Sequence, residues 1–280
     1  MLVMRSFFIL LFVTLFVGVL VLDWYLAGTI PWSRYESSTQ QSIDGVPFCE
    51  HDRSQNFLRE RVNSLSDFSF LGVGFYMLVQ SIETKSNSLT KTIILSVING
   101  LTNCVHAFGS WLNHACRCQF GHRLDVTGMW LVTSFITLYS VMQHIRIENK
   151  KVTLFLFTFM FLLIAYIFWH ASDVYYPKSY DNREKILVIG CIIMFLISEF
   201  VYMKFSKMKK KQMKLLGFGL TMILIGGLCG HLDVTKIICW PKSWFQLHAL
   251  WHICAACSVL CAYEYFRCEN SEIVNLDHLD

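Results

Sequence analysis

Residues 245–266, FQLHALWHICAACSVLCAYEYF, decide the class of fold. The stretch is mainly apolar and carries no lysine or arginine, and about 20 such residues are enough for one helix to cross the hydrocarbon core of a bilayer. His248 and His252, four residues apart, lie inside it, although ionisable side chains are costly at that depth and usually mark a functional site. The stretch therefore predicts a membrane helix with a polar site on one face.

The rest of the chain repeats this apolar pattern. Of its 280 residues, 54% are hydrophobic, 15% aromatic and only 16% charged, which is typical of a membrane protein. Apolar windows long enough to span a bilayer recur near residues 6–24, 66–82, 93–113, 125–143, 152–170, 186–204, 213–231 and 246–266. We therefore predict an all-α membrane protein, a seven-transmembrane helical bundle preceded by one extra N-terminal hydrophobic helix.

The first window follows Arg5 and lacks a clean cleavage motif of small residues. Such a segment favours a retained signal anchor over a cleaved signal peptide, which is the alternative. Asp23 and Trp24 are expected at the interfacial end of this anchor. The predicted organisation is an anchor or signal peptide at 1–24, a luminal loop at 25–64, the seven-helix domain at 65–267 and a flexible cytoplasmic tail at 268–280.

Basic residues set the expected orientation. They gather in every second connection, at Lys85 and Lys91, at Arg146, Lys150 and Lys151, and in KFSKMKKKQMK at 204–214. The positive-inside rule places these connections in the cytoplasm and the intervening loops on the luminal or exterior side. The net charge of +4 then indicates anchoring near anionic lipid rather than a nucleic-acid interface. Glu199, one turn before the last of these connections, is expected to snorkel toward the interface or to pair with Lys204.

With this topology, polar residues from three predicted helices end at the same luminal leaflet. Ser110 and His114 share a face near the luminal end of the third window, because residues four apart lie above one another on a helix. Asp125 opens the fourth window, and His248 and His252 open the last one. The sequence therefore predicts that these side chains converge.

Three histidines of this kind can hold zinc with one coordination position open, which is typical of catalytic rather than structural zinc sites. Zinc in such a site activates water and polarises a carbonyl group. Asp125 would then act as general base and afterwards as general acid, and Ser110 would orient the water or stabilise the oxyanion. A single histidine near a helix end is more often a hydrogen-bonded interfacial residue than a ligand, so the prediction of amide or ester hydrolysis depends on the convergence.

Two blocks, GSWLNHACRCQFGHRLDVTGMW (109–130) and FQLHALWHI (245–253), resemble the signature blocks of the alkaline ceramidase family. That family belongs to a wider superfamily of seven-span membrane hydrolases that includes adiponectin-receptor-like proteins. The resemblance covers residues 47 to 266 approximately. It implies a zinc-dependent amidohydrolase that cleaves ceramide-like lipids into a sphingoid base and a fatty acid, in an endoplasmic reticulum or Golgi membrane. Its zinc ligands would be His114, His248 and His252, and its catalytic residues Ser110 and Asp125.

The segment VPFCEHDRSQNFLRERVNSLSDFSFL (46–71) is similar to the family's D-W-C-E-E-N segment, which binds calcium. The resemblance implies calcium ligands at Glu50, Asp52, Glu60 and the Phe48 carbonyl, since oxygen ligands suit this cation. Pro47 stands where the family has its first aspartate, and Glu60 is matched only with one deletion, so a solvated acidic loop is the alternative. The family also has a bridge between these regions, which implies a disulfide between Cys49 and Cys239.

Two other functions are compatible with these residues. A related hydrolase could use the same zinc on another lipid ester or amide, and a receptor-like or scaffold protein could hold zinc structurally. A structural site would be closed by a fourth protein ligand, whereas a catalytic one keeps a position open. The expected partners are a ceramide-like lipid and the bilayer, with no nucleic acid and no obligate protein partner.

Overall fold

The computed structural model describes residues 2–26, 48–83, 93–144, 150–174, 182–205 and 210–270. Over these residues the chain forms helices and connecting loops, with no strand. The helices are α1 (Leu2–Tyr25), α2 (Arg61–Ser66), α3 (Phe68–Glu83), α4 (Ile93–Cys116), α5 (Gln119–His144), α6 (Lys150–Val174), α7 (Asn182–Phe205), α8 (Lys210–Val234) and α9 (Leu247–Asn270). The predicted all-α class with an extra N-terminal apolar helix is confirmed. Pro47 and most of the predicted tail, residues 271–280, lie outside the described residues.

Each predicted apolar window lies almost entirely within one long helix, and the largest difference is at α5. This helix begins at Gln119, whereas the apolar window begins at residue 125. The helix extends into the polar residues because its backbone hydrogen bonds form whatever the polarity of the side chains. Asp125 therefore lies in the second turn of α5 instead of opening the helix. The short helix α2, six residues long, was not predicted.

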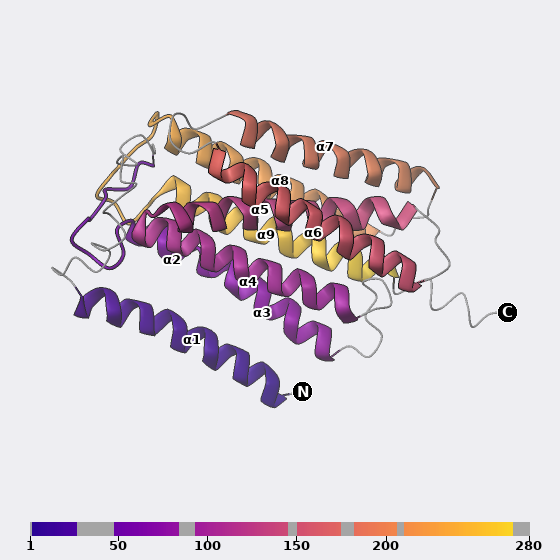
Figure 1. Ribbon diagram of the computed structural model, residues 1–280, viewed down its shortest axis with the longest axis horizontal. Coiled ribbons are helices and arrows are strands. Elements are labelled where there is room, and N and C mark those ends of the chain that lie inside the picture. The colour runs from indigo at the N-terminus through magenta and orange to yellow at the C-terminus, as the bar shows by residue number, and fades with distance from the viewer. Residues whose placement is uncertain are drawn as a thin grey trace.

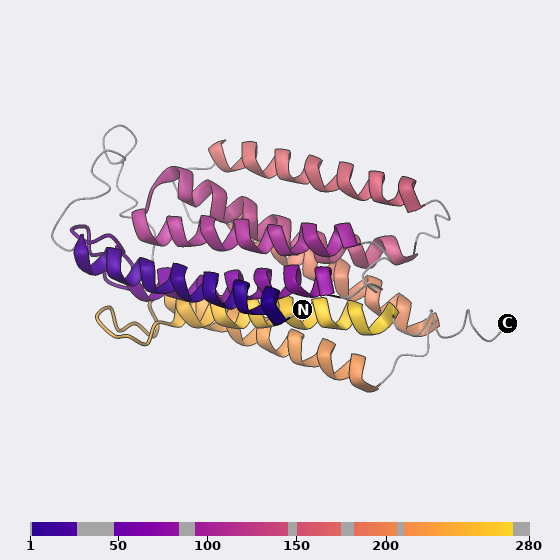
Figure 2. The same cartoon turned by 90° about the horizontal axis from the view of Figure 1, so that it is seen from below.

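The long helices lie side by side along the long dimension of the molecule (Figure 1). Consecutive helices alternate in direction, so residues 48–60 and 235–246 lie at one end of the bundle, which we call the loop end. Within the bundle, α5 contacts α4, α6 and α7, while α9 packs against α8 and α3. α1 lies along the outside against α3 (Figures 1 and 2). The alternation brings the last turn of α4 and the first turns of α5 and α9 to the loop end.

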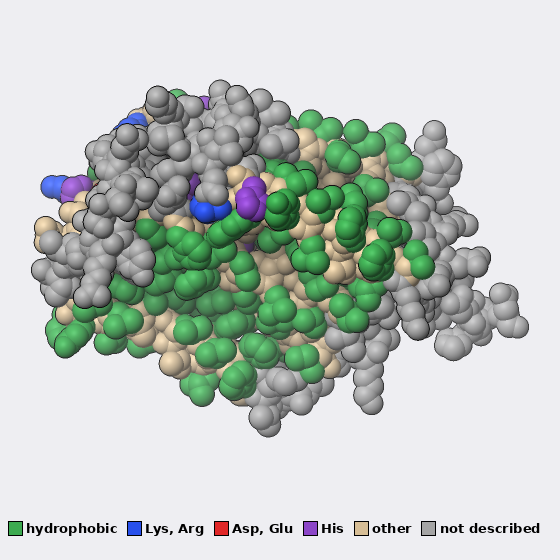
Figure 3. All heavy atoms as spheres, in the orientation of Figure 1, with side chains coloured by type: hydrophobic (Ala, Val, Ile, Leu, Met, Phe, Trp, Pro, Cys, Tyr) green, Lys and Arg blue, Asp and Glu red, His purple; other side chains and the backbone are tan. Residues whose placement is uncertain are grey.

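The outer surface of the bundle is apolar, as a lipid environment requires. Phe155 and Tyr166 on α6, Phe200 on α7 and Leu224 on α8 are each more than 60% exposed, and hydrophobic side chains predominate on the described part of the face in Figure 3. In the described part of the chain, five helices are long and apolar enough to cross a membrane, namely α1, α3, α5, α8 and α9. α6 and α7 contain shorter apolar stretches, Leu154–His170 and Ile189–Val201. The chain is a multi-pass membrane protein, and the count of seven spans after α1 stays a prediction.

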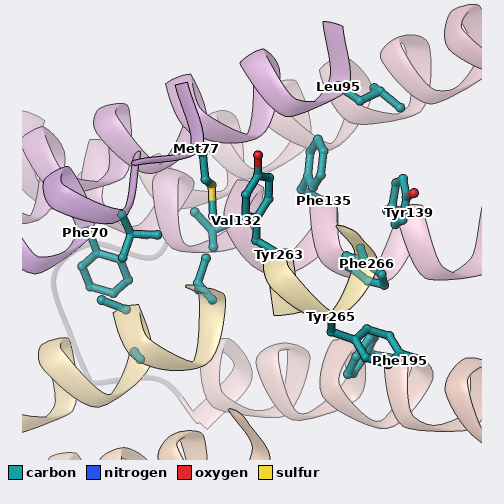
Figure 4. Packing of buried hydrophobic residues seen from close by; sticks show 14 of the residues in the cluster. Phe70, Met77, Leu95, Val132, Phe135, Tyr139, Phe195, Tyr263, Tyr265 and Phe266 are labelled. Carbon is teal, nitrogen blue, oxygen red and sulfur yellow. The ribbon is translucent and has the colours of Figure 1, made fainter. Parts of the chain in front are cut away.

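A buried core joins all the long helices from α3 to α9, and Figure 4 shows part of it. Close backbone packing of α4 on α5 depends on two glycines. A Cβ on Gly109 would lie 2.7 Å from the Leu124 carbonyl carbon, and one on Gly128 would lie 2.7 Å from the His106 Cα. Small residues allow such close approach of membrane helices. Gly109 therefore sets the spacing at the point where α4 and α5 bring Ser110 and Asp125 to the loop end.

The half of the bundle away from the loop end also contains buried polar side chains, which we call the Glu199 cluster. Glu199 on α7 accepts hydrogen bonds from Ser140 of α5 and Tyr265 of α9, and the Ser140 Oγ lies 2.8 Å from the Ser198 Oγ. Since Glu199 is only 1% exposed, the prediction that it snorkels toward the interface is wrong. Interhelical hydrogen bonds, which sequence spacing did not reveal, hold the carboxyl group inside. The side chain of Lys204 lies outside the described residues.

Candidate functional site

Three histidines from two helices meet at the loop end. His114 comes from the last turn of α4, and His248 and His252 from the first turns of α9. Their possible ligand atoms all lie within 4.8 Å of one another, and the three residues are 1%, 6% and 4% exposed. Within the described part of the chain, no other His, Cys, Asp or Glu joins this group. The geometry suits a metal ion with three protein ligands and one open position.

Two buried nitrogens support a metal as the missing partner. Nε2 of His114 and Nδ1 of His248 have no hydrogen-bond partner among the described residues. An unsatisfied buried polar atom costs about 1–3 kcal/mol, so native structures rarely leave two side by side. Neutral imidazole nitrogen is a ligand that zinc prefers. The three residues therefore fit a zinc ion.

Acidic side chains next to α3 and α4 orient two of these rings. Glu60 Oε2 lies 2.6 Å from Nδ1 of His114, and both side chains are 1% exposed. Nδ1 of His252 lies 2.8 Å from the Ser66 Oγ and 3.0 Å from Oδ1 of Asp67. A carboxylate on one nitrogen fixes the ring and leaves the other nitrogen for the metal. Glu60 and Asp67 thus supply the outer support that metal-binding histidines commonly have.

Ser110 and Asp125 lie beside the histidine cluster. Both line one cavity together with His248 and His252. Asp125 on α5 accepts a hydrogen bond of 2.8 Å from the Asn113 side chain of α4, while Ser110 is 1% exposed. The structure therefore brings together all five residues for which the sequence predicted zinc binding or catalysis.

The cavity continues from the histidines into the bundle. Beyond Asp125 its walls are mainly apolar and come from α5, α7, α8 and α9, including Ile136, Phe195, Leu220 and Val259. Asp125 and Thr137, twelve residues apart on α5, both line it, and twelve helical residues span about 18 Å. The cavity has a polar end at the histidines and a long apolar end between the helices.

A disulfide and a buried carboxylate connect the loop before α2 to the start of α9. The structure joins Cys49 to Cys239, the pair that the resemblance implies. Asp233 accepts hydrogen bonds from the backbone amides of Cys49 and His248, at 3.0 and 3.3 Å. These contacts hold the Phe48 ring 4.1 Å from the His248 ring, measured between centroids. A second disulfide, Cys116 to Cys118, adjoins His114 and was not predicted.

Comparison with known proteins assigns the family. The ceramidase family model matches residues 40–276, which is most of the chain. The chain belongs to the ceramidase family. Membership makes this ceramidase a membrane hydrolase of ceramide amide bonds, with a lipid substrate. Comparison with individual curated proteins gives no match.

The carboxylates expected to bind calcium are held by arginines and backbone amides in this ceramidase. Asp52 forms ion pairs with Arg59 and Arg117, and Glu50 accepts hydrogen bonds from Arg53 and from the first backbone amides of α2. Burial raises the pKa of the Glu50 carboxyl. Burial alone would also raise the pKa of Asp52, but the two guanidinium groups lower it below its usual value.

Four residues of the site were not assigned these roles from the sequence. Glu60 was expected to bind calcium, and Asp67, Asn113 and Asp233 were not singled out. The sequence does carry one signal for Asp67, because this acidic residue stands directly before the apolar run FSFL. No such signal identifies the others, since their partners lie on other segments of the chain.

Proposed function

We propose that this ceramidase is a zinc-dependent amidohydrolase that cleaves ceramide-like sphingolipids to a sphingoid base and a free fatty acid. The observation that carries the proposal is the cluster of three buried histidines with an open position, of which His248 and His252 line one cavity with Asp125 and Ser110. His114, His248 and His252 would hold the zinc. When bound, zinc supplies a Lewis acid for the amide carbonyl and lowers the pKa of water.

Asp125 carries the proton in the proposed reaction. It accepts a proton from the attacking water and returns it to the nitrogen of the leaving amine, so that the C–N bond is replaced by a carboxylic acid and an amine. The hydrogen bond from Asn113 keeps Oδ2 of Asp125 in place, while Oδ1 lies 3.7 Å from Nδ1 of His106, which lines the same cavity. Ser110 donates a hydrogen bond to the oxyanion that develops on the carbonyl oxygen.

The shape of the cavity supports a lipid amide rather than a small polar substrate. The reacting amide would lie at the histidine end, and one hydrocarbon chain would occupy the apolar part between α5, α7, α8 and α9. Burial of each CH2 group contributes about 0.8 kcal/mol of transfer free energy relative to water. Within a membrane this advantage is smaller, so the walls determine chain fit more than affinity.

The predicted topology completes the proposal. Seven spans after α1 would place the loop end on the luminal side, where an endoplasmic reticulum or Golgi lumen favours disulfides. The bridge between Cys49 and Cys239 lies at that end. Mass mapping of the protein without reduction tests this point, because two free thiols would contradict a luminal bridge.

The main experiment measures hydrolysis of a panel of ceramides and other lipid esters and amides by the purified protein, with and without a zinc chelator. We expect ceramide hydrolysis that stops on chelation and returns with zinc. Asp125→Asn should keep its zinc and lose activity by roughly 100- to 10,000-fold. Glu264→Gln, which also replaces a carboxylate by an amide but lies at the far end of α9, is the control. Zinc-loaded protein without activity on any lipid would contradict the proposal and favour a receptor-like role.

A further inference from the structure

The loop at residues 48–60 is charged, and its carboxylates face arginines. Both oxygens of Asp52 bind the Arg59 guanidinium, with Nε to Oδ1 at 2.8 Å and Nη2 to Oδ2 at 2.6 Å. Nη1 of Arg117, which follows α4, donates to the same Oδ2 at 3.1 Å. Such two-point contacts between arginine and a carboxylate are the strongest ion pairs in proteins. Both oxygens of Asp52 are therefore already bound by guanidinium groups.

Glu50 is engaged by backbone as well as by arginine. Its Oε1 accepts from the Arg53 Nη1 at 2.9 Å and from the Val62 amide at 2.9 Å, and its Oε2 accepts from the Asn63 amide at 2.8 Å. The two amides belong to the first turn of α2, where backbone N–H groups have no partner within the helix. If the Glu50 carboxylate turned away to bind a calcium ion, these two backbone amides would lose their hydrogen-bond acceptor.

Glu60 completes the set and connects it to the histidine cluster. Oε2 of Glu60 lies 2.6 Å from Nδ1 of His114, and Oε1 lies 3.6 Å from Nε of Arg117. The guanidinium of Arg117 thus contacts both Asp52 and Glu60, the position between carboxylates that a bound cation would take. The backbone of Arg117 has φ of 52°. This left-handed conformation is uncommon for residues other than glycine and persists only where surrounding contacts hold it.

The formal charges of this cluster cancel without a metal ion. Three carboxylates, on Glu50, Asp52 and Glu60, face three guanidinium groups, on Arg53, Arg59 and Arg117. Calcium needs 6–8 oxygen ligands, whereas five of these six carboxylate oxygens already accept hydrogen bonds from nitrogen donors, and the sixth, Oε1 of Glu60, lies 3.6 Å from Nε of Arg117. A calcium ion placed among them would also be repelled by the guanidinium groups. The residues present do not fit calcium.

We infer that Arg59 and Arg117 take the place of the calcium ion that the resemblance implies, so that this ceramidase orders the loop at residues 48–60 and positions Glu60 on His114 without calcium. The inference concerns the loop and holds whichever lipid is the substrate. It rests on the proposed function only in treating His114 as a metal ligand. Arg117 is then a positioning residue, which acts on the metal through Glu60.

The first test uses the full-length protein in detergent, purified without added calcium. We expect metal analysis to find far less than one calcium per chain, and the midpoint of thermal unfolding to stay constant as calcium is added. A ligand that binds only the native state raises this midpoint as its concentration increases. One calcium per chain, or a midpoint that rises with calcium, would overturn the inference. Neither readout requires lipid hydrolysis, so a failed activity assay leaves this test intact.

The second test compares Arg117→Gln with Lys242→Gln, a change at an exposed residue of the loop before α9. The Arg117 variant should bind zinc roughly 10- to 100-fold more weakly, because the support for a ligating histidine is disturbed. The Lys242 variant should match the unaltered protein. Equal zinc affinity in both variants would show that Arg117 does not position Glu60. The calcium measurement on the unaltered protein decides the inference even if the Arg117 variant does not fold.

Discussion

Two groups of buried polar side chains lie in the helical bundle, the histidine cluster at the loop end and the Glu199 cluster in the other half. Both connect helices that are far apart in the sequence. His114 of α4 meets His248 and His252 of α9, while Glu199 of α7 meets Ser140 of α5 and Tyr265 of α9. By burial alone the two groups could not be told apart, since all of these histidines and Glu199 are less than 9% exposed.

Their hydrogen bonds distinguish them. Both oxygens of Glu199 accept hydrogen bonds from neighbouring helices. In the histidine cluster, Nε2 of His114 and Nδ1 of His248 have no such partner within the described chain. A satisfied buried group stabilises one arrangement of helices, whereas unsatisfied atoms on two rings whose centroids lie 5.0 Å apart are open to a ligand. The comparison therefore favours a structural role for Glu199 and supports the proposed metal-binding role of the histidines.

The largest effect is expected from His248→Ala. Zinc content should fall from about one per chain to near zero, and ceramide hydrolysis should fall at least about 1,000-fold, equivalent to about 4 kcal/mol of transition-state stabilisation. The fold should persist, because the change removes a nitrogen that has no protein partner. His231→Ala, an exposed histidine in the last turn of α8, is the control. Normal zinc content and activity in the His248 variant would contradict a metal-binding role for the histidine cluster, which would then be structural like the Glu199 cluster.

Glu60→Gln should have an intermediate effect. The amide cannot support Nδ1 of His114 as a carboxylate does, so the dissociation constant for zinc should rise roughly 10- to 100-fold. Activity should return when zinc is supplied in excess, because Glu60 does not face the reacting amide in the proposed mechanism. Zinc titration followed by metal analysis measures the shift. An unchanged zinc affinity would mean that the 2.6 Å contact to His114 is structural, like those of Glu199.

Glu199→Gln tests the other half of the comparison. One hydrogen bond to Ser140 or Tyr265 should become a donor facing a donor, which lowers the free energy of unfolding by about 1–2 kcal/mol. Zinc content and ceramide hydrolysis below the unfolding temperature should not change. Glu264→Gln, at a more exposed ion pair with Arg267, should cost less than about 1 kcal/mol. Loss of zinc from the Glu199 variant would show that the two clusters are coupled.

The apolar windows were sufficient to predict the long helices, because about 20 apolar residues have few alternatives to a membrane helix. Spacing and topology together also identified Ser110, His114, Asp125 and the α9 pair. Each of these residues lies on a helix whose direction the sequence indicates, so its depth could be estimated. The start of α5 was placed too late, since hydropathy does not detect helical turns that are polar.

The residues that support the site could not be predicted in the same way. The contacts of Glu60, Asp67 and Asp233 depend on how an irregular loop folds over helix ends, which no periodic pattern describes. Resemblance suggested calcium for Glu60, yet its neighbours include Arg117, on a segment 57 residues later. Ion pairs between residues so far apart in the sequence can be recognised only from the three-dimensional structure. The same reason explains why Glu199 was expected at the interface and lies in the core.

The smallest effect is expected from Asp23→Asn at the end of α1. This variant tests whether a carboxylate at the loop end affects zinc binding merely because it lies there. Asp23 is 4% exposed, and it accepts hydrogen bonds from the Leu58 amide at 2.9 Å and from Nε of Arg61 at 2.8 Å. It is therefore a satisfied carboxylate, as Glu199 is, although it lies at the loop end and was expected at the membrane interface. Asparagine keeps an acceptor for Leu58 and loses the ion pair, so the free energy of unfolding should fall by about 1 kcal/mol.

Zinc content and activity of the Asp23 variant should stay normal, with Trp24→Leu, a change at a residue that is 80% exposed, as the control. Denaturant titration in detergent measures the stability of both variants. Loss of zinc from the Asp23 variant would mean that a carboxylate with satisfied hydrogen bonds affects zinc binding when it lies at the loop end. That result would contradict the conclusion that such groups are only structural. An unchanged free energy of unfolding would indicate instead that residues 1–24 are removed as a signal peptide, because a cleaved helix cannot bind Arg61. The satisfied hydrogen bonds of Asp23 thus test both the retention of α1 and the rule that separates the two clusters.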